Sequence, residues 1–263
     1  MPEIQRLAPE DARDNAAWDD FVARHPQATF FHRAGWQRIL REVFRHTPYY
    51  LLARQGGRIT GVLPLAHVKS LLFGSALTSL PFAVYGGVVA DDEVSAERLL
   101  AEAERQAARL GVAHLELRHL TRQRPAWPEQ DLYVTFRKPL LPDEAQNLLA
   151  IPRKQRAMVR KGIKHGLKSE IDTGVDRFFA LYADNVHRHG TPALPRRYFQ
   201  ALQREFGADC ELLTVTAPDG RALSGVLSFY FRDEVLPYYA GDDLAARELA
   251  ANDFKYWELM RRA

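Results

Sequence analysis

The stretch Ile151–Leu167, IPRKQRAMVRKGIKHGL, decides the architecture expected of the second half of this 263-residue chain. Pro152 stands where a first helical residue would stand, and Gly166 followed by Leu167 is a typical helix end. On a helix with a 100° step, the six basic residues between them fall within roughly 160° of arc. They are Arg153, Lys154, Arg156, Arg160, Lys161 and Lys164. The stretch therefore predicts a helix over residues 151–166 with a purely basic outer face.

The opposite side of this helix is expected to carry Met158, Val159, Gly162 and Ile163. Basic residues in a first helical turn oppose the macrodipole, and like charges four residues apart repel, so this charge does not serve helix stability. The stretch between Glu144 and Glu170 holds no acid. Such a face is expected to bind a polyanion, a phosphate or a pyrophosphate. The alternative is a solvated helix that happens to lack acids.

The composition is that of an ordinary globular protein, with 46% hydrophobic and 26% charged residues. The net charge is only +3, so the positive charge is local to the basic helix. The single cysteine, Cys210, excludes an intramolecular disulfide and fits a reducing compartment. The N-terminus does not resemble a signal peptide, and no apolar run approaches the roughly 20 residues that span a bilayer. We therefore expect a soluble, cytoplasmic protein without a transmembrane segment, with peripheral membrane contact left open.

Hydrophobic periodicity predicts alternating helices and strands along the chain. Two turns, Gln55–Arg58 and Pro218–Arg221, read as hairpin connections. The expected helices are 14–24, 34–44, 95–110, 151–166, 175–188, 196–206 and 249–263. The expected strands are 3–8, 49–53, 59–67, 112–117, 132–136, 211–216, 222–231 and 235–240.

The two halves of the chain repeat each other at an offset of 163 residues. Trp36-Gln37, Arg41-Glu42 and Gly57-Arg58 match Phe199-Gln200, Arg204-Glu205 and Gly220-Arg221, and after one insertion Gly61-Val62-Leu63 matches Gly225-Val226-Leu227. We therefore predict an α/β protein of two tandem units, 1–138 and 139–263, each with a mixed sheet flanked by helices. In the first half a strand follows the last helix, whereas the second half stops at Ala263. We accordingly expect that the natural chain continues beyond this point.

This order of elements resembles the Gcn5-related N-acetyltransferase (GNAT) fold, and a tandem pair with a basic helix resembles the FemAB-like family of peptidoglycan-bridge aminoacyltransferases. The resemblance is carried by FFHRAGW (30–36), IPRKQRAMVRKGIKHGL (151–167), LPYYAG (236–241) and ANDFKYWELMRRA (251–263). It is nearest to the branch associated with exosortase (PEP-CTERM) and exopolysaccharide gene clusters. It implies an acyl- or aminoacyltransferase that forms an amide bond on a phosphate-bearing peptidoglycan or exopolysaccharide precursor.

The site expected from this resemblance combines the basic helix with side chains near the cleft between the units. Its six basic residues would hold the diphosphate of a nucleotide-sugar or lipid-diphosphate precursor. The further candidates are Tyr85, Tyr238, Tyr239, Asn252 and Lys255, with core packing as the alternative reading of the tyrosines. No general base stands out, so the catalytic residues stay unassigned, and no Cys/His cluster indicates a metal.

The acyl donor implied by the family is aminoacyl-tRNA, although the interval from Asp172 to Asp209 is too short for the coiled-coil arm of tRNA-using members. Acetyl-CoA is disfavoured because the segment before the last helix lacks the glycine-rich turn that holds a pyrophosphate, and Asp242-Asp243 would repel phosphate. Two other functions stay open: a small-molecule N-acyltransferase with a non-CoA donor, and a non-catalytic RNA- or polyanion-binding protein. The lack of Phe, Tyr and Trp in residues 151–167 counts against RNA.

Overall fold

A computed structural model describes residues 1–70, 72, 74–130 and 133–263 and divides the chain into two compact units, Met1–Glu129 and Gln130–Ala263. The division expected after residue 138 and the division after Glu129 both fall in the segment between β8 and α4. Within the described ranges, the helices are all too short or too polar to cross a membrane.

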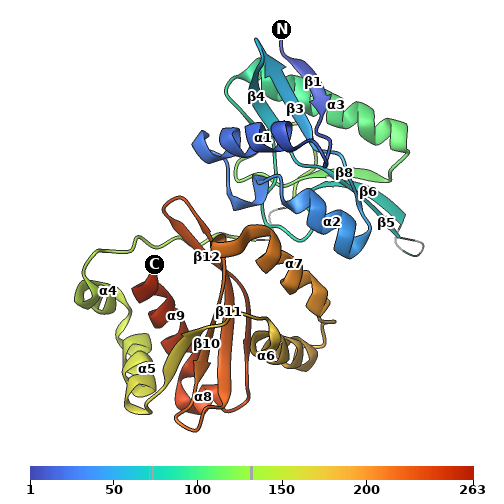
Figure 1. The fold of residues 1–263 in the computed structure, drawn as a ribbon. Helices are drawn as coiled ribbons and strands as arrows, with labels where there is room; N and C mark the ends of the chain where they lie inside the picture. Colours follow the sequence, from blue (N-terminus) through green and yellow to red (C-terminus); the bar gives the residue numbers. More distant parts are fainter. Residues whose placement is uncertain (71, 73, 131–132) are drawn as a thin grey trace. The chain divides into compact units, whose positions relative to one another are not determined.

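The first unit holds two four-stranded sheets, in the orders β1-β3-β4-β7 and β2-β5-β6-β8 (Figure 1). All neighbouring strands pair antiparallel except β6 and β8, which are parallel. Its elements are β1 (Glu3–Arg6), α1 (Ala12–Arg24), a short 3-10 helix (Phe30–His32), α2 (Trp36–Phe44), β2 (Thr47–Pro48), β3 (Leu51–Gln55), β4 (Arg58–Leu63), β5 (Ala66–Ser70), β6 (Gly74–Ser79), β7 (Val89–Ala90), α3 (Glu93–Leu110) and β8 (His114–Leu117).

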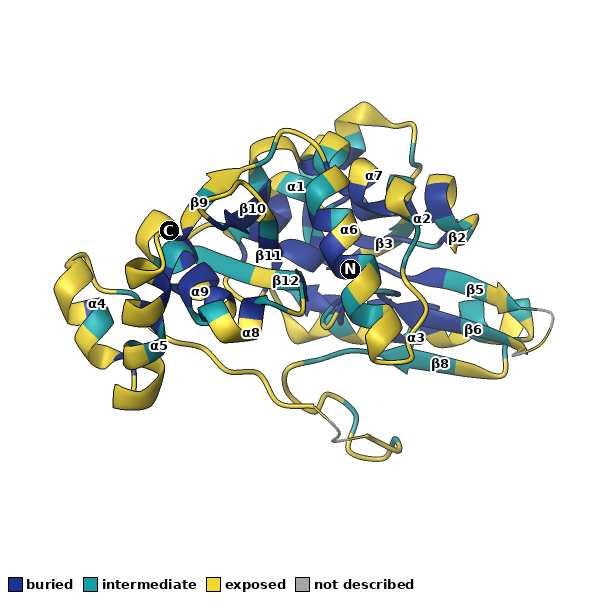
Figure 2. Cartoon of the chain, turned by 90° about the horizontal axis from the view of Figure 1, so that it is seen from below, coloured by how far each residue is buried: buried dark blue, intermediate teal, exposed yellow. Residues whose placement is uncertain are grey.

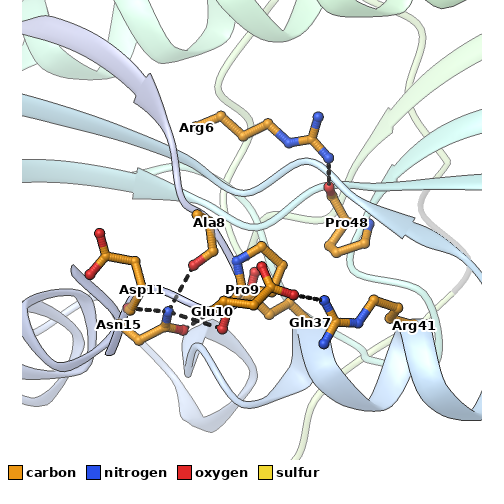
Figure 3. A network of polar contacts seen from close by, with 9 residues as sticks. All are labelled: Arg6, Ala8, Pro9, Glu10, Asp11, Asn15, Gln37, Arg41 and Pro48. Atoms are coloured by element: carbon orange, nitrogen blue, oxygen red, sulfur yellow. Dashed lines mark hydrogen bonds and ion pairs between the residues drawn. The ribbon is translucent and has the colours of Figure 1, made fainter. Parts of the chain in front are cut away.

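A polar network fixes the connection between β1 and α1 in this unit (Figure 3). The Asn15 side-chain amide donates to the carbonyls of Ala8 at 3.0 Å and Asp11 at 2.6 Å. Its oxygen accepts from Gln37 Nε2 of α2 at 2.6 Å, and Arg41 of α2 pairs with Glu10. Asn15 and Gln37 are both buried, so these bonds satisfy polar groups inside the unit and tie α1 to α2.

Three side chains hold the loop between β6 and β7. His32 is buried, accepts from the Thr29 N–H through Nδ1 at 3.1 Å and contacts the Gly87 carbonyl through Nε2 at 3.0 Å. Arg118 donates to the Leu80 and Ala83 carbonyls, and His119 Nε2 accepts from the Val88 N–H at 2.9 Å. Burial lowers the pKa of both histidines to about 4. The loop is therefore fixed by neutral imidazoles rather than left free.

The second unit has one antiparallel sheet, in the order β12-β11-β10-β9. Figure 1 shows α9 on one side of this sheet and α6 on the other. Its elements are α4 (Glu144–Ala150), α5 (Arg153–Lys164), β9 (Lys168–Ile171), α6 (Asp176–Arg188), α7 (Arg196–Phe206), a short 3-10 helix (Gly207–Asp209), β10 (Cys210–Thr216), β11 (Ala222–Phe231), β12 (Glu234–Asp242), α8 (Ala246–Leu249) and α9 (Ala251–Arg262).

Both units place two helices between the first and second strand of a four-stranded sheet, followed by a hairpin, an edge strand and a helix. The predicted α/β class with two similar units is therefore confirmed. The two units differ after the hairpin: the Leu-Pro pair of the second unit, Leu236-Pro237, lies inside β12, whereas Leu80-Pro81 of the first unit opens the loop that His32 and His119 hold.

Helix α5 forms where the sequence predicts it, and its C-terminal end is the expected glycine motif. Gly166 has φ 68°, its N–H donates to Ile163, and the Leu167 N–H donates to Gly162. At the other end, Pro152 is the cap residue rather than the first helical one. The prediction that Ile163 lies on the side of α5 opposite the basic face is wrong. Its side chain is 52% exposed, because its position on the helix borders Arg156.

Several predicted boundaries were wrong. The strand expected over 132–136 is absent from its described part, residues 133–136, and Leu132 lies outside the described residues. The helix expected over 249–263 is two helices, because Ala250 adopts a left-handed conformation with φ 61°. The strand expected over 59–67 is divided between β4 and β5. The sequence reading missed α4, β6 and β9, which are short and follow no clear period.

We predict that Gly162→Leu loosens α5 from α9. A Cβ at Gly162 would lie 2.8 Å from the Phe254 Cβ, so a larger side chain forces the two helices apart. We expect a loss of about 2 kcal/mol in the free energy of unfolding and faster trypsin cleavage within α5. Urea denaturation and timed proteolysis measure the two effects. Ile163→Leu on the same helix is the control, and equal behaviour of the two variants would disprove the close packing.

We also predict that the first unit loses stability as the pH falls from 6.5 towards 4. The folded-state pKa of His32 is about 4, below the usual 6.5, so the unfolded chain takes up the proton first. The loss attributable to His32 should reach about 3 kcal/mol. Denaturation at a series of pH values should show a flatter dependence for His32→Gln, whereas His114→Gln, at an exposed histidine, should follow the wild-type curve.

Candidate functional site

The basic face of α5 is the most strongly charged surface of the second unit. It consists of Arg153, Lys154, Arg156, Arg160, Lys161 and Lys164, of which Arg156 is partly buried and the other five are exposed. None of these six side chains forms an ion pair or hydrogen bond with any residue that the structure describes. The expected amphipathic helix is therefore present, with its charge directed to solvent.

Packing against α9 holds this face in place. Ile151, Val159 and Trp257 form a buried cluster, with Leu148 and Met260 against it. The first turn of α5 has no acidic residue and no side-chain cap, so its backbone N–H groups add to the positive potential of Arg153, Lys154 and Arg156. The N-terminal half of α5 can consequently bind an anion with both backbone and side-chain donors.

Tyr238 and Tyr239 lie inside β12, which continues past the predicted strand end at residue 240 to Asp242. The Tyr239 hydroxyl is 3.0 Å from that of Tyr198, and its ring contacts Tyr182 and Phe199. The Tyr238 ring packs on Phe229 at 5.5 Å. Burial raises the pKa of Tyr198 and Tyr239 well above the usual value of a tyrosine. Within this unit, the two tyrosines belong to aromatic contacts formed by β11, β12, α6 and α7.

Lys255 is a fully buried cation on α9. Its Nζ lies 3.1 Å from the Asp242 carboxylate and 5.0 Å from the centre of the Tyr256 ring. Asp242 also accepts from the Ser224 hydroxyl, and its own side chain is 31% exposed. Burial lowers the pKa of Lys255, and Asp242 opposes that shift. The pair joins the end of β12 to α9.

The candidate side chains of the second unit do not meet at one point. Asp242 and Tyr239 are three residues apart on β12 and therefore face opposite sides of the sheet. Lys255 lies on the α9 side of the sheet. Tyr239 lies on the α6 side together with Gly241, where a Cβ would contact the backbone of α6. Asn252 is exposed at the start of α9. Tyr85 belongs to the first unit, where its ring contacts Phe31.

Asp242 is the residue whose role the sequence reading missed. The sequence indicates only that its charge would repel phosphate. In the structure, Asp242 forms an ion pair with Lys255 and accepts a hydrogen bond from Ser224. A signal existed in the sequence: Lys255 stands between Phe254 and Tyr256, and the residues one helical turn away, Ala251 and Leu259, are apolar. A lysine in such a setting requires a buried acidic partner.

Two other features of the second unit carry no candidate chemistry. Burial raises the pKa of the Cys210 thiol to about 12, so this cysteine is not a ready nucleophile. An open groove of about 560 Å³ lies between the start of α6 and α7, and none of the predicted site residues lines it. Across the described residues, His, Cys, Asp and Glu nowhere gather in a group of three or more that could hold a metal ion.

Among known protein families, residues 153–263 match the one described as an acetyltransferase (GNAT) domain. A segment of 103 residues is 28% identical to the UDP-N-acetylmuramoylpentapeptide-lysine N(6)-alanyltransferase of Weissella viridescens. That match covers 38% of this chain but only 31% of the relative, so the chain matches about a third of the curated relative's length.

Solved structures show the same fold over nearly the whole chain. The crystal structure of FemX superposes with a TM-score of 0.71 at 14% identity, covering 99% of this chain and 85% of that chain. A tandem GNAT protein from the clavulanic acid biosynthesis pathway superposes with a TM-score of 0.55 at 14% identity, covering all of this chain and 85% of that one. The chain therefore shares its fold with FemX and with a tandem GNAT protein.

We predict unequal effects for the two partners of the buried ion pair. Asp242→Ala leaves a fully buried ammonium without its carboxylate and should lower the free energy of unfolding by about 3 kcal/mol. Lys255→Met leaves a partly exposed Asp242 that still accepts from Ser224, and should cost less than about 1 kcal/mol. Chemical denaturation of both variants measures the difference.

The pH dependence provides the control for this assignment. Because the pKa of Lys255 is lowered in the folded protein, the unfolded chain binds more protons than the folded chain at pH values just below 10.5. The free energy of unfolding therefore rises with pH in this range. The defect of Asp242→Ala should consequently shrink as the pH is raised. A defect that is the same at every pH, or equal losses in the two variants, would rule out a charged Lys255 as the cause.

Proposed function

We propose that this chain, whose residues 153–263 form an acetyltransferase (GNAT) domain, is an acyltransferase that joins an amino acid to a phosphate-bearing cell-envelope precursor. The observation that carries the proposal is the basic face of α5, which packs on α9 within the matched domain and lacks ion partners among the described residues. Such a face is suited to the diphosphate of an activated precursor.

The acceptor proposed first is a peptidoglycan precursor. The Weissella viridescens relative is named for an alanyl transfer to a UDP-linked muramoyl pentapeptide, which carries a diphosphate. An exopolysaccharide precursor, as in the exosortase-associated branch, would present the same diphosphate and is the alternative acceptor. Arg153 and Arg156 are the residues proposed to contact the phosphates, because they combine guanidinium groups with the uncapped first turn of α5.

The proposed donor is aminoacyl-tRNA. The acceptor amine attacks the ester carbonyl of the donor, the new C–N bond forms, and the C–O ester bond breaks. The amine proton passes to the released ribose hydroxyl. Acetyl-CoA is disfavoured as donor, because the connection from β12 to α9 carries Asp243, and Asp253 stands in the first turn of α9. We place the reaction in the cytoplasm, where charged tRNA is available.

Binding of a UDP-muramoyl pentapeptide, measured by titration calorimetry, tests the role of α5. Arg153→Ala/Arg156→Ala should weaken binding by at least about 100-fold, because each of the two arginines is expected to contribute about 1.5–3 kcal/mol through hydrogen bonds to the charged phosphates. The double variant Arg13→Ala/Arg58→Ala removes two exposed arginines of the first unit and is the matched control.

Transfer of alanine from alanyl-tRNA to the same acceptor, followed by mass spectrometry, tests the activity itself. The product should gain the mass of one alanyl group on an amine, and the α5 double variant should raise the KM for the acceptor more than it lowers kcat. Undiminished acceptor affinity in that variant would remove the role given to Arg153 and Arg156. Transfer from acetyl-CoA in place of alanyl-tRNA would refute the proposed donor.

A further inference from the structure

Three large aliphatic side chains of the α4–α5 region are exposed. They are Leu141 at 42%, Leu149 at 63% and Ile163 at 52%, and we call them the apolar border. Single exposed aliphatic residues are common on protein surfaces. These three, however, lie on or directly before the two helices that carry the basic face or adjoin it. Figure 2 shows α4 and α5 beside each other as largely exposed helices.

The apolar border is held by specific contacts rather than by a loose segment. The Asn147 side chain is buried, accepts from the Leu141 N–H at 2.8 Å and donates to the Leu141 carbonyl at 2.6 Å. Leu148 packs on the cluster of Ile151, Val159 and Trp257, which leaves the adjacent Leu149 directed outward. Ile163 is fixed by α5 itself, next to Arg156 and Arg160 on the helix surface.

The acids nearest to this region have partners of their own. Glu144 of α4 and Glu258 of α9 both pair with Arg261, and Glu258 also accepts from Ser169. Asp143 caps α4 by accepting from the Gln146 N–H. No described acid neutralises the basic face. Its six positive charges lie on α5, and the apolar border lies on the same helix and in the α4 region beside it.

We propose that this region is a docking surface for an anionic lipid bilayer. The basic face provides the attraction to anionic headgroups, and the apolar border inserts at the boundary between headgroups and acyl chains. Charge alone would also fit an RNA backbone. The exposed aliphatic residues favour lipid, because single-stranded RNA is normally bound by stacking on aromatic side chains, and residues 151–167 contain no Phe, Tyr or Trp.

The proposal does not depend on the acyltransferase activity. A diphosphate contact at Arg153 and Arg156 concerns the N-terminal half of α5, whereas membrane docking also requires Lys161, Lys164 and the apolar border. A chain that docks on the bilayer would meet lipid-linked precursors at the surface where their diphosphates lie. Docking would therefore add to the proposed function without being required for binding of a water-soluble acceptor.

Co-sedimentation of the full chain with vesicles tests the surface. Binding should be detectable with phosphatidylcholine/phosphatidylglycerol vesicles, weak with phosphatidylcholine alone, and lowered by added salt. Lys161→Glu/Lys164→Glu should weaken binding to the anionic vesicles by roughly ten-fold or more. Leu149→Ser/Ile163→Ser should weaken it as well, with little change in its salt dependence. Leu244→Ser, at a leucine that is 75% exposed in the same unit, is the control.

Two parallel measurements separate this surface from the other possibilities. Circular dichroism melting confirms that each variant is folded, and binding of the UDP-muramoyl pentapeptide should be the same for Leu149→Ser/Ile163→Ser as for the wild type. Equal binding to neutral and anionic vesicles, or no effect of the two serine substitutions, would overturn the proposal. Tighter binding to a tRNA transcript than to anionic vesicles, lost with Lys161→Glu/Lys164→Glu, would instead identify the face as a nucleic-acid site.

Discussion

The contact between α5 and α9 is the constraint on which the second unit's surface depends. Gly162 brings the two helices so close that a side chain at this position would meet Phe254, and Val159 and Trp257 complete the buried contact. Because the apolar side of α5 is fully used in this way, its six basic residues can only face solvent. Repulsion between its like-charged side chains destabilises a basic helix, and the packing of α5 on α9 offsets this destabilisation. The glycine motif at Gly166 then ends the helix and leads the chain directly into β9.

A second constraint is the burial of charge at the end of β12. Lys255 is enclosed by α9 and the sheet, and Asp242 supplies its counter-charge, so the strand end and the helix must keep their relative positions. The aromatic cluster around Tyr239 lies on the other side of the same strand. The ion pair and the aromatic cluster therefore lie on opposite sides of the sheet, although Asp242 and Tyr239 are only three residues apart in the sequence. The same strand shifts its register opposite Leu227 and Ser228.

The relation to FemX and to a tandem GNAT protein rests on fold, since identity is 14% in both cases. GNAT folds host many acyl transfers, so the reaction must be argued from the site. In its own geometry, this chain combines a helix with a solvent-facing basic side, α5, with a connection from β12 to α9 that carries acidic residues. The charge at the end of β12 is negative and committed to Lys255, and the positive charge lies on α5. This distribution favours a donor without a CoA pyrophosphate and an acceptor that brings its own phosphates.

The sequence by itself determined the α/β class, the two repeated units and the basic helix with its glycine end. These features depend on local periodicity, turn chemistry and composition, which are written in neighbouring residues. Only the tertiary structure decided that Ile163 faces solvent, that Tyr239 packs against Tyr198 and Phe199, and that Lys255 has Asp242 as its partner. The same holds for the three side chains that fix the loop before β7. Each of these depends on contacts between residues distant in the chain, or on which side of an element its neighbours cover, and no local pattern encodes either.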